Sequence, residues 1–210
     1  TDCGMIRREP FGVVAGITPW NYPLDQATFK LFAAMAAGNT VVLKPSQNAP
    51  LCCCILAEAI EEAGFPNGVF NLVTGAGGEV GNAIALHEGI DALSFTGSTS
   101  GGIEVGKLAL STVKKITLEL GGKSPLVVLE GADLEAAVAD ACSSAFMNTG
   151  QTCCAYTRML IPESKKDEIE AGDFQKYPVL GYARHSGLGK YTRNFFKEHG
   201  VLPNFICESP

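Results

Sequence analysis

Short apolar runs alternate with longer runs of helical spacing over the first 120 residues, and most changes are marked by Gly or Pro. Val, Ile and Leu fill the short runs, as in buried strands, while the longer runs have the three-to-four-residue period of amphipathic helices. Expected strands span 11–17, 40–44, 69–73, 91–95 and 115–120, and expected helices span 24–37, 49–63, a run ending near 86, and 99–110. Strands separated by helices predict an α/β fold with a doubly wound parallel sheet.

A second α/β pattern begins after residue 124. It consists of a strand at 125–129, a helix at 133–146 and a strand at 158–161, and it is not continued beyond residue 170. We therefore expect the start of a second domain. The join near Glu170 has no structural explanation in the sequence.

Composition indicates a globular protein, with 46% hydrophobic and 18% charged residues. A net charge of −6 gives no basic footprint for nucleic acid or for an anionic membrane surface. No apolar run approaches the roughly 20 residues of a membrane span, and the first ten residues lack the apolar core of a signal peptide. We therefore predict that the protein binds neither nucleic acid nor a membrane.

Eight cysteines are present, and five of them stand in the contiguous groups 52–54 and 153–154. Contiguous cysteines are poorly placed to pair with distant partners, and the usual zinc-ligand spacings are missing, so we predict no metal site. Reduced thiols in a cytoplasmic protein are the better interpretation.

Cys153 is the candidate nucleophile. It follows the expected helix at 133–146 after a break at Gly150, in Phe146-Met147-Asn148-Thr149-Gly150-Gln151-Thr152-Cys153-Cys154. A thiol in such a loop can reach solvent and a substrate. On spacing alone, the alternative is that both cysteines are small core residues, because free Cys is among the most buried residue types.

Two stretches resemble signatures of the aldehyde dehydrogenase superfamily. Its cysteine signature F-x-N-x-G-Q-x-C is matched from Phe146 to Cys153, and its glutamate signature L-E-L-G-G-K-S-P is matched from Leu118 to Pro125. The resemblance implies that Cys153 attacks an aldehyde, with Cys154 at a variable position. It also implies that Glu119 is the general base and that Asn21, in Pro19-Trp20-Asn21-Tyr22-Pro23, holds the oxyanion.

The same resemblance implies a Rossmann-like domain that binds NAD. Lys44 matches the lysine that bonds the adenosine ribose; the alternative is a strand-terminal surface lysine. Gly97 and Ser98 would meet the pyrophosphate at a helix N-terminus, and Trp20 and Gly77 would lie beside the cofactor. Gln47 replaces the glutamate of many NAD-preferring members, which predicts tolerance of NADP, because an amide does not repel a 2′-phosphate.

The resemblance gives roles to four parts of the chain: an oligomerisation arm at 1–10, an NAD(P)-binding domain at 11–118, a partial catalytic domain at 119–170, and a C-terminal oligomerisation tail at 171–210. The tail resembles the family's closing segment near Tyr182 and Ser186. The family's E-x-F-G-P motif is not found in this sequence. We therefore predict a truncated or internally deleted chain whose own activity is in question.

Two other functions remain open at this stage. One is a Cys/His hydrolase that pairs Cys153 with His87, His185 or His199, although it explains neither the Gly-Ser loop nor the alternating strands. The other is a catalytically incompetent fragment that acts as a binding or assembly module. Strand-like arms predict a homodimer or homotetramer, and the sequence leaves the identity of the aldehyde substrate open.

Overall fold

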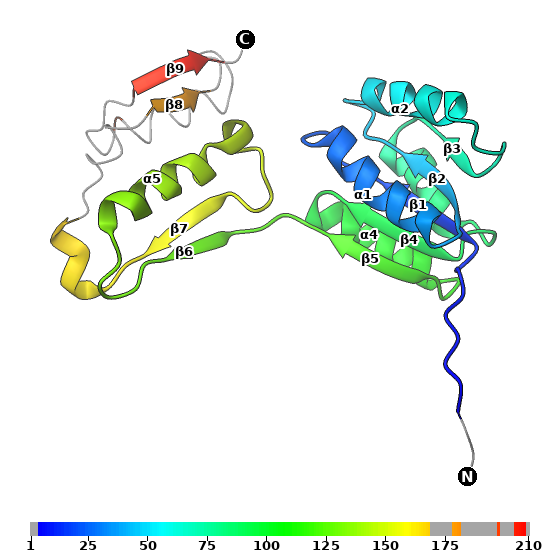
Figure 1. Ribbon diagram of the computed structural model, residues 1–210, viewed down its shortest axis with the longest axis horizontal. Helices are drawn as coiled ribbons and strands as arrows, with labels where there is room; N and C mark the ends of the chain where they lie inside the picture. Colours follow the sequence, from blue (N-terminus) through cyan, green and yellow to red (C-terminus); the bar gives the residue numbers. More distant parts are fainter. Residues whose placement is uncertain (1–3, 169–177, 182–196, 198–203, 209–210) are drawn as a thin grey trace. The chain divides into compact units, whose positions relative to one another are not determined.

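The computed structural model describes residues 4–168, 178–181, 197 and 204–208 and divides into two compact units, Thr1–Gly121 and Gly122–Pro210 (Figure 1). The four domain ranges expected from the sequence carry roles as well as bounds, and they stay predictions.

The first unit is built on one five-stranded sheet in which every pair of neighbouring strands is parallel. Its strands are β1 (Val13–Ile17), β2 (Thr40–Lys44), β3 (Phe70–Leu72), β4 (Ala92–Thr96) and β5 (Lys115–Glu119), in the spatial order β3-β2-β1-β4-β5. Its helices are α1 (Pro23–Ala36), α2 (Leu51–Glu62), α3 (Asn82–Leu86) and α4 (Thr99–Leu110). The predicted doubly wound parallel sheet is confirmed.

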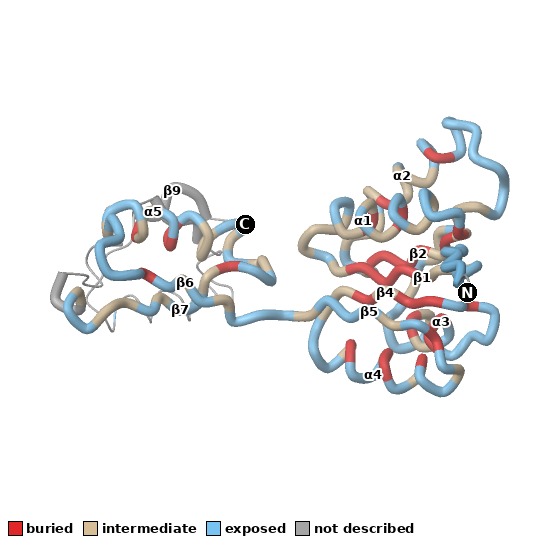
Figure 2. Tube along the Cα trace, turned by 60° about the horizontal axis from the view of Figure 1, so that its bottom comes forward, coloured by how far each residue is buried: buried red, intermediate tan, exposed pale blue. Residues whose placement is uncertain are grey.

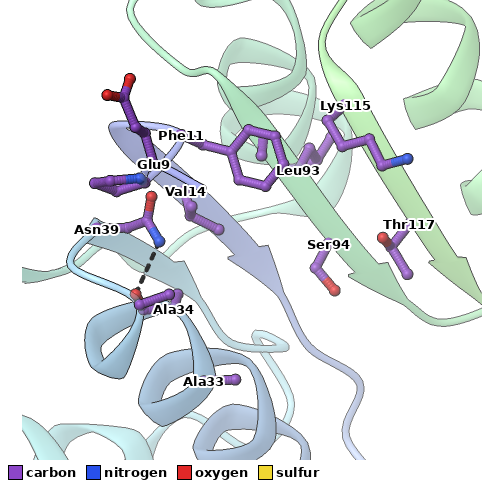
Figure 3. Close-up of a pocket in the computed structure, with 13 residues that line it drawn as sticks. Glu9, Phe11, Val14, Ala33, Ala34, Asn39, Leu93, Ser94, Lys115 and Thr117 are labelled. Atoms are coloured by element: carbon purple, nitrogen blue, oxygen red, sulfur yellow. Dashed lines mark hydrogen bonds between the residues drawn. The ribbon is translucent and has the colours of Figure 1, made fainter. Parts of the chain in front are cut away.

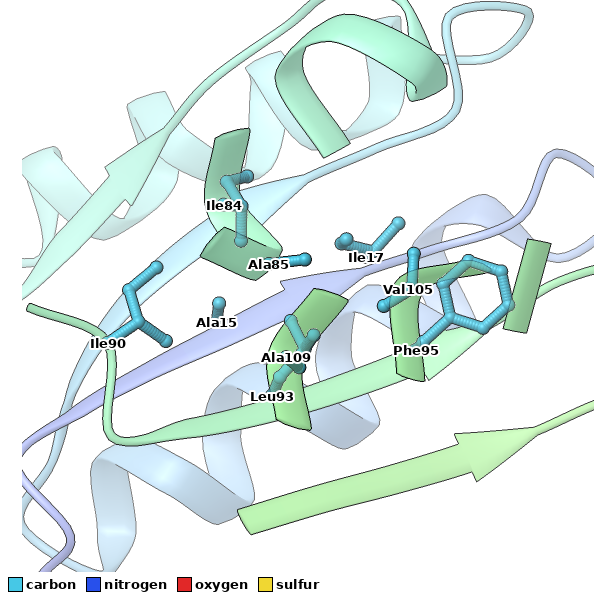
Figure 4. Close-up of a cluster of buried hydrophobic side chains, with 9 residues drawn as sticks. All are labelled: Ala15, Ile17, Ile84, Ala85, Ile90, Leu93, Phe95, Val105 and Ala109. Atoms are coloured by element: carbon cyan, nitrogen blue, oxygen red, sulfur yellow. The ribbon is translucent and has the colours of Figure 1, made fainter. Parts of the chain in front are cut away.

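Each face of the sheet has its own core, which follows the alternation of side chains along the strands. On one face α1 and α2 pack over β1, β2 and β3, around Leu31 and Leu43, both fully buried. On the other face α3 and α4 cover a cluster that includes Ile17, Phe95 and Val105 (Figure 4). The buried residues of the first unit concentrate along β1, β2 and β4 (Figure 2).

Two element boundaries differ from the sequence-based expectation for identifiable reasons. β1 begins at Val13 rather than at residue 11, because Gly12 has φ +117° and its N–H donates to Asn39 Oδ1 at 3.0 Å. The helix expected after the glycine-rich run is a π-helical turn, Gly77–Gly81, followed by the short α3.

The second unit contains a parallel pair of strands, β6 (Ser124–Val127) and β7 (Tyr156–Leu160), with α5 (Leu134–Ala145) between them in sequence and packed on β7. The carboxylate of Asp133 caps α5 by accepting the Ala136 N–H at 3.1 Å. A 3₁₀ turn follows β7, and a second parallel pair is formed by β8 and β9. These three elements span Glu163–Glu168, Pro178–Gly181 and Asn204–Glu208.

Parts of the expected C-terminal organisation lie outside the described residues. They include the join near Glu170 and the positions Tyr182 and Ser186 of the tail motif. Within the described part of the chain, the helices are all too short or too polar to span a bilayer.

Candidate active site

The strand order of the first unit reverses at β1. The chain passes from β1 to β2 on one side and later returns to β4 on the other, and Ile17 lies in register with both Lys44 and Phe95. In open parallel sheets, ligands bind beyond the carboxyl ends of the strands at such a switch point. The predicted cofactor residues that follow β1, β2 and β4 therefore meet at one edge.

Ser98 caps the helix that starts at this edge. Its Oγ accepts the Gly101 N–H at 3.1 Å and lies 3.2 Å from Ser100 Oγ, and the side chain is exposed. The free N–H groups of the first turn of α4, together with the helix dipole, favour an anion there. Ser98 is thus placed where a pyrophosphate could be bound.

The start of α4 lies so close to the sheet that side chains are excluded from it. A Cβ added to Gly97 would come within 2.7 Å of Phe95 Cζ, and one added to Gly102 would come within 2.5 Å of Leu120 Cδ2. Where the backbone approaches a phosphate group closely, a side chain would block the approach, and glycine is therefore required. Gly97 therefore has a packing reason for being Gly, independent of any role towards a ligand.

Lys44 is buried, with 2% of its surface exposed, so the alternative of a surface lysine is wrong. Its Nζ donates to the Pro45 carbonyl at 2.8 Å, and burial lowers the pKa of its ammonium group. The side chain extends towards the turn before α3, since a Cβ added to Gly81 would lie 4.0 Å from Lys44 Cδ. A buried ammonium at a sheet edge is costly unless a further partner offsets the loss of water.

The other predicted cofactor residues lie around the same edge. Trp20, in the segment between β1 and α1, is 48% exposed, so it is not a core residue. Gln47 is exposed in the turn between β2 and α2, and Gly77 is exposed at the start of the π-helical turn. In this segment Gly75, rather than Gly77, is the position that requires glycine. Gly75 has φ +144°, and a Cβ added to it would lie 2.5 Å from Val80 Cγ2.

Thr18 was not found by sequence reasoning. It follows β1 at the switch point, is 3% exposed, and its Oγ1 has no hydrogen-bond partner among the residues that the structure describes. An unsatisfied buried hydroxyl costs on the order of 1–3 kcal/mol. An orphaned hydroxyl, a buried ammonium and a glycine-flanked helix N-terminus at one edge fit a dinucleotide with polar ribose and phosphate groups.

Glu119 ends β5 at the same edge. It is paired in register with Thr96, its carbonyl accepts the Gly97 N–H at 3.1 Å, and its side chain is exposed. Lys30 of α1 donates to Thr96 Oγ1 at 2.7 Å. Burial lowers the pKa of Lys30, and the nearby Glu119 carboxylate acts in the opposite direction with a smaller effect. Lys30 is a second residue that sequence reasoning missed, because 66 residues separate it from Thr96.

Asn21 is half-buried between β1 and α1, one residue before the helix N-cap. Asn21, Glu119 and the predicted cofactor residues thus belong to one unit and to one edge of its sheet.

Cys153 belongs to the second unit, in the loop from α5 to β7. Asn148, Thr149 and Gly150 have φ values of 49°, 56° and 76°, a left-handed turn that is unusual for residues other than Gly. The Thr152 hydroxyl donates to the Met147 carbonyl at 3.2 Å. After this turn the thiols of Cys153 and Cys154 are both exposed, so the alternative of two core cysteines is wrong.

The predicted meeting of Glu119 with Cys153 joins residues of two separate units, and it stays a prediction. The same holds for His87 of the hydrolase alternative. His87 ends α3 in the first unit and accepts the Gly89 N–H at 3.0 Å through Nδ1, while His185 and His199 lie outside the described residues.

A hollow of about 290 Å³ lies on the α1 side of the sheet, away from this edge (Figure 3). It is lined by Phe11 of the arm before β1, by residues of α1, and by residues of the strands that include Val14 of β1 and Lys115 of β5. It contains none of the predicted catalytic or cofactor residues.

Comparison with known proteins agrees with this geometry. A sequence model described as "Aldehyde dehydrogenase family" matches residues 1–177. The chain belongs to the aldehyde dehydrogenase family. The resemblance that was based on the cysteine and glutamate motifs is confirmed.

Individual aldehyde dehydrogenases are similar over most of this chain. It is 51% identical over 181 residues to 3-succinoylsemialdehyde-pyridine dehydrogenase from a Pseudomonas species, which is 85% of this chain and 38% of that protein. A solved structure of aldehyde dehydrogenase C from Pseudomonas syringae, a cysteine-to-alanine mutant with NAD+ and octanal, is 43% identical with a TM-score of 0.80. The match covers 96% of this chain and 38% of that one.

An NADP-dependent enzyme from E. coli is also similar, at 44% identity and a TM-score of 0.74 over 76% of this chain and 33% of that one. The chain thus spans between 33% and 38% of the length of these three relatives.

Proposed function

We propose that this chain is part of an enzyme that oxidises an aldehyde to a carboxylic acid with NAD+, through a covalent intermediate on Cys153. The observation that carries the proposal is the exposed thiol of Cys153. It follows a left-handed turn in a chain that belongs to the aldehyde dehydrogenase family. A solvent-accessible thiolate is the nucleophile that this chemistry requires.

The chemistry explains why a nucleophile is needed at all. An aldehyde carbon does not release hydride readily, because its carbonyl oxygen carries no negative charge that can push the electrons out. Addition of the Cys153 thiolate to that carbon gives a thiohemiacetal with an anionic oxygen. The Asn21 amide would donate a hydrogen bond to this oxygen, and loss of one such donor costs on the order of 10²–10³ in rate.

The bound dinucleotide supplies the hydride acceptor, and loss of hydride leaves a thioester on Cys153. Water then attacks the thioester carbon, Glu119 takes a proton from that water, and the carboxylic acid leaves as the thiolate is restored. The balance is one aldehyde, one NAD+ and one water consumed for each acid, reduced cofactor and proton formed.

Cofactor binding is assigned to the carboxyl edge of the sheet. Ser98 would bind the pyrophosphate, with Gly97 allowing the close approach, and Lys44 and Gln47 would bind ribose hydroxyls. Trp20 and Gly77 would flank the dinucleotide. The neutral Gln47 supports use of NADP as well as NAD, and the relatives include both an NAD+ complex and an NADP-dependent enzyme.

The proposed setting of the protein is a cytoplasmic homo-oligomer. Six cysteines whose side chains the structure describes are free thiols, which supports a cytoplasmic location. Strand-like terminal segments support a homodimer or homotetramer. Octanal, which is bound in one related structure, is a reasonable first substrate for assays.

Cys153→Ala and the matched control Cys154→Ala test the proposal, with NAD+ and octanal as substrates. Both thiols are exposed and adjacent, so the two variants remove similar groups from one loop. We expect C153A to abolish formation of reduced cofactor and C154A to retain most of it. Formation of reduced cofactor by C153A at the rate of an active unaltered protein would contradict the assignment of the nucleophile.

The residues assigned to the cofactor all belong to the first unit, whereas Cys153 belongs to the second, and this supports a second candidate, in which the chain binds the dinucleotide without turning over. Titration with NAD+ separates the two. Binding without any reduced cofactor in the unaltered chain favours the second candidate, whereas turnover that depends on Cys153 favours the first.

A further inference from the structure

Gly122 touches the backbone of the nucleophile's own residue. A Cβ built on Gly122 would lie 2.6 Å from the carbonyl oxygen of Cys153 and 3.5 Å from Ser124 Oγ. Ordinary van der Waals contact begins near 3.4 Å, so the carbonyl would have to move by about 0.8 Å to admit a methyl group. At the preceding residue, Gly121, an added Cβ meets no atom within 4 Å.

We propose that Gly122 is a positioning residue for the reaction, whose missing side chain lets the Cys153 peptide lie against the backbone before β6 and so fixes where the thiol stands. The proposal rests on the assignment of Cys153 as the nucleophile. Gly122 itself is assigned no contact with the substrate or the cofactor.

The Gly122 side of the contact has little freedom. Lys123, the next residue, has its carbonyl held by Arg158 Nη2 at 2.8 Å. Ser124 then enters β6, where it is paired with Tyr156 of β7. A methyl group on Gly122 therefore cannot be accommodated by a simple shift of this segment.

The Cys153 side is restrained as well. Ala155 is 4% exposed, and its N–H donates to the Thr152 carbonyl at 3.2 Å. The Tyr156 N–H donates to Ser144 Oγ at the end of α5, at 3.4 Å. The peptide that joins Cys153 to Cys154 is planar, so its oxygen moves either by rotation of the whole peptide or together with the Cys153 Cα. Because the chain is held on the Ala155 side, we expect the displacement to include the Cα and therefore the thiol.

A displacement of this size matters for catalysis. Misplacement of a reacting group by 1 Å can cost on the order of 10²-fold in rate. For a shift of about 0.8 Å we expect at least a tenfold loss in the rate of thiol addition. The Michaelis constant for NAD+ should be little changed, because the residues assigned to cofactor binding belong to the other unit.

The test compares Gly122→Ala with Gly121→Ala in the full 210-residue chain. Each protein is mixed with octanal and NAD+ and quenched in acid within the first turnover, and mass spectrometry of the peptide that carries Cys153 gives the ratio of acylated to unmodified Cys153. Both forms come from one digest, so the ratio cancels differences in concentration and digestion. Melting curves report whether each variant is folded at the temperature of the reaction.

We expect the ratio to fall by about tenfold in G122A and to stay within about twofold of the unaltered value in G121A. An unchanged ratio in folded G122A overturns the proposal. So does a G122A chain whose second unit no longer folds, because Gly122 would then serve folding rather than placement of the thiol. Failure of the proposed function would look different: C153A would retain full turnover, or no acyl group would form on Cys153 in the unaltered chain.

Discussion

Replacing Lys44 by Met tests the cofactor edge, because affinity and stability should respond differently. Lys44 as a residue is 2% exposed; Met keeps most of the length of its side chain and removes the ammonium group, which donates to the Pro45 carbonyl at 2.8 Å. A hydrogen bond from a charged donor is worth about 1.5–3 kcal/mol. At 1.36 kcal/mol per factor of ten, loss of that bond to a ribose hydroxyl weakens NAD+ binding by about 10- to 150-fold.

The stability of K44M should change much less. The variant no longer buries a charge, which is favourable, but it leaves the Pro45 carbonyl without its donor, which is unfavourable by about 1–3 kcal/mol. We expect the two effects to offset each other to within about 1 kcal/mol in the free energy of unfolding. An affinity change in a protein of nearly unaltered stability would locate the effect at the ligand.

The pH dependence of K44M gives an independent check. Burial lowers the pKa of Lys44 in the folded protein below its ordinary value of 10.5. Between the lowered pKa and 10.5 the unfolded chain binds more protons than the folded one, so this residue makes the protein more stable as pH rises through that window. K44M lacks this increase. Its stability relative to the unaltered protein should therefore be highest at the low-pH side of the window.

Fluorescence of Trp20, the single tryptophan of the chain, can follow the NAD+ titration, since this side chain is half exposed at the proposed edge. Lys107→Met is the control, because Lys107 is an exposed lysine on α4, and it should shift the dissociation constant by less than about twofold. An unchanged dissociation constant for NAD+ in K44M would refute a role of Lys44 in binding the cofactor. An equal loss of affinity in K107M would show that removing any positive charge has this effect.

Three other substitutions test further parts of the structure. Ser98→Ala removes the cap of α4, so it should lower the free energy of unfolding by about 1 kcal/mol and weaken NAD+ binding. Ser100→Ala, the control, should have smaller effects on both. Urea unfolding measures the stability, and calorimetric titration measures the binding. Gln47→Glu should raise the NAD+ preference in kcat/KM by at least about tenfold through repulsion of the 2′-phosphate. A preference above roughly a thousandfold in the unaltered protein, about 4 kcal/mol, would contradict the role of Gln47. Leu31→Ala, in a fully buried side chain, should cost about 2–5 kcal/mol, whereas Leu51→Ala, at 76% exposure, should cost less than about 0.5 kcal/mol in the same unfolding assay.

Local patterns predict most of the first unit. The run of β-branched residues at β1 and the glycines after α1 and α2 carry enough local information to place strands and helices within a few residues. The parallel order then follows from the alternation of strands with helices. The exact start of β1 could not be predicted, because it depends on the contact of Gly12 with Asn39, 27 residues away.

The site is less accessible to sequence reasoning than the fold. Motifs identify Ser98 and Lys44, but whether a strand-terminal lysine is buried depends on the turn that packs against it. Thr18 and Lys30 carry no motif of their own. Their importance arises from an unmatched hydroxyl and from a hydrogen bond between α1 and β4, and neither can be inferred from neighbours in sequence.

If Cys153 is the nucleophile, its sulfur becomes acylated during turnover, and the acyl group can be located directly. The protein is mixed with octanal and NAD+, quenched in acid within the first turnover, digested and analysed by tandem mass spectrometry. We expect an octanoyl thioester on Cys153 that does not form without NAD+ and that accumulates when Glu119 is replaced by Gln. An acyl group on Cys154 or on another residue, or formation of reduced cofactor with Cys153 unmodified throughout, would contradict it.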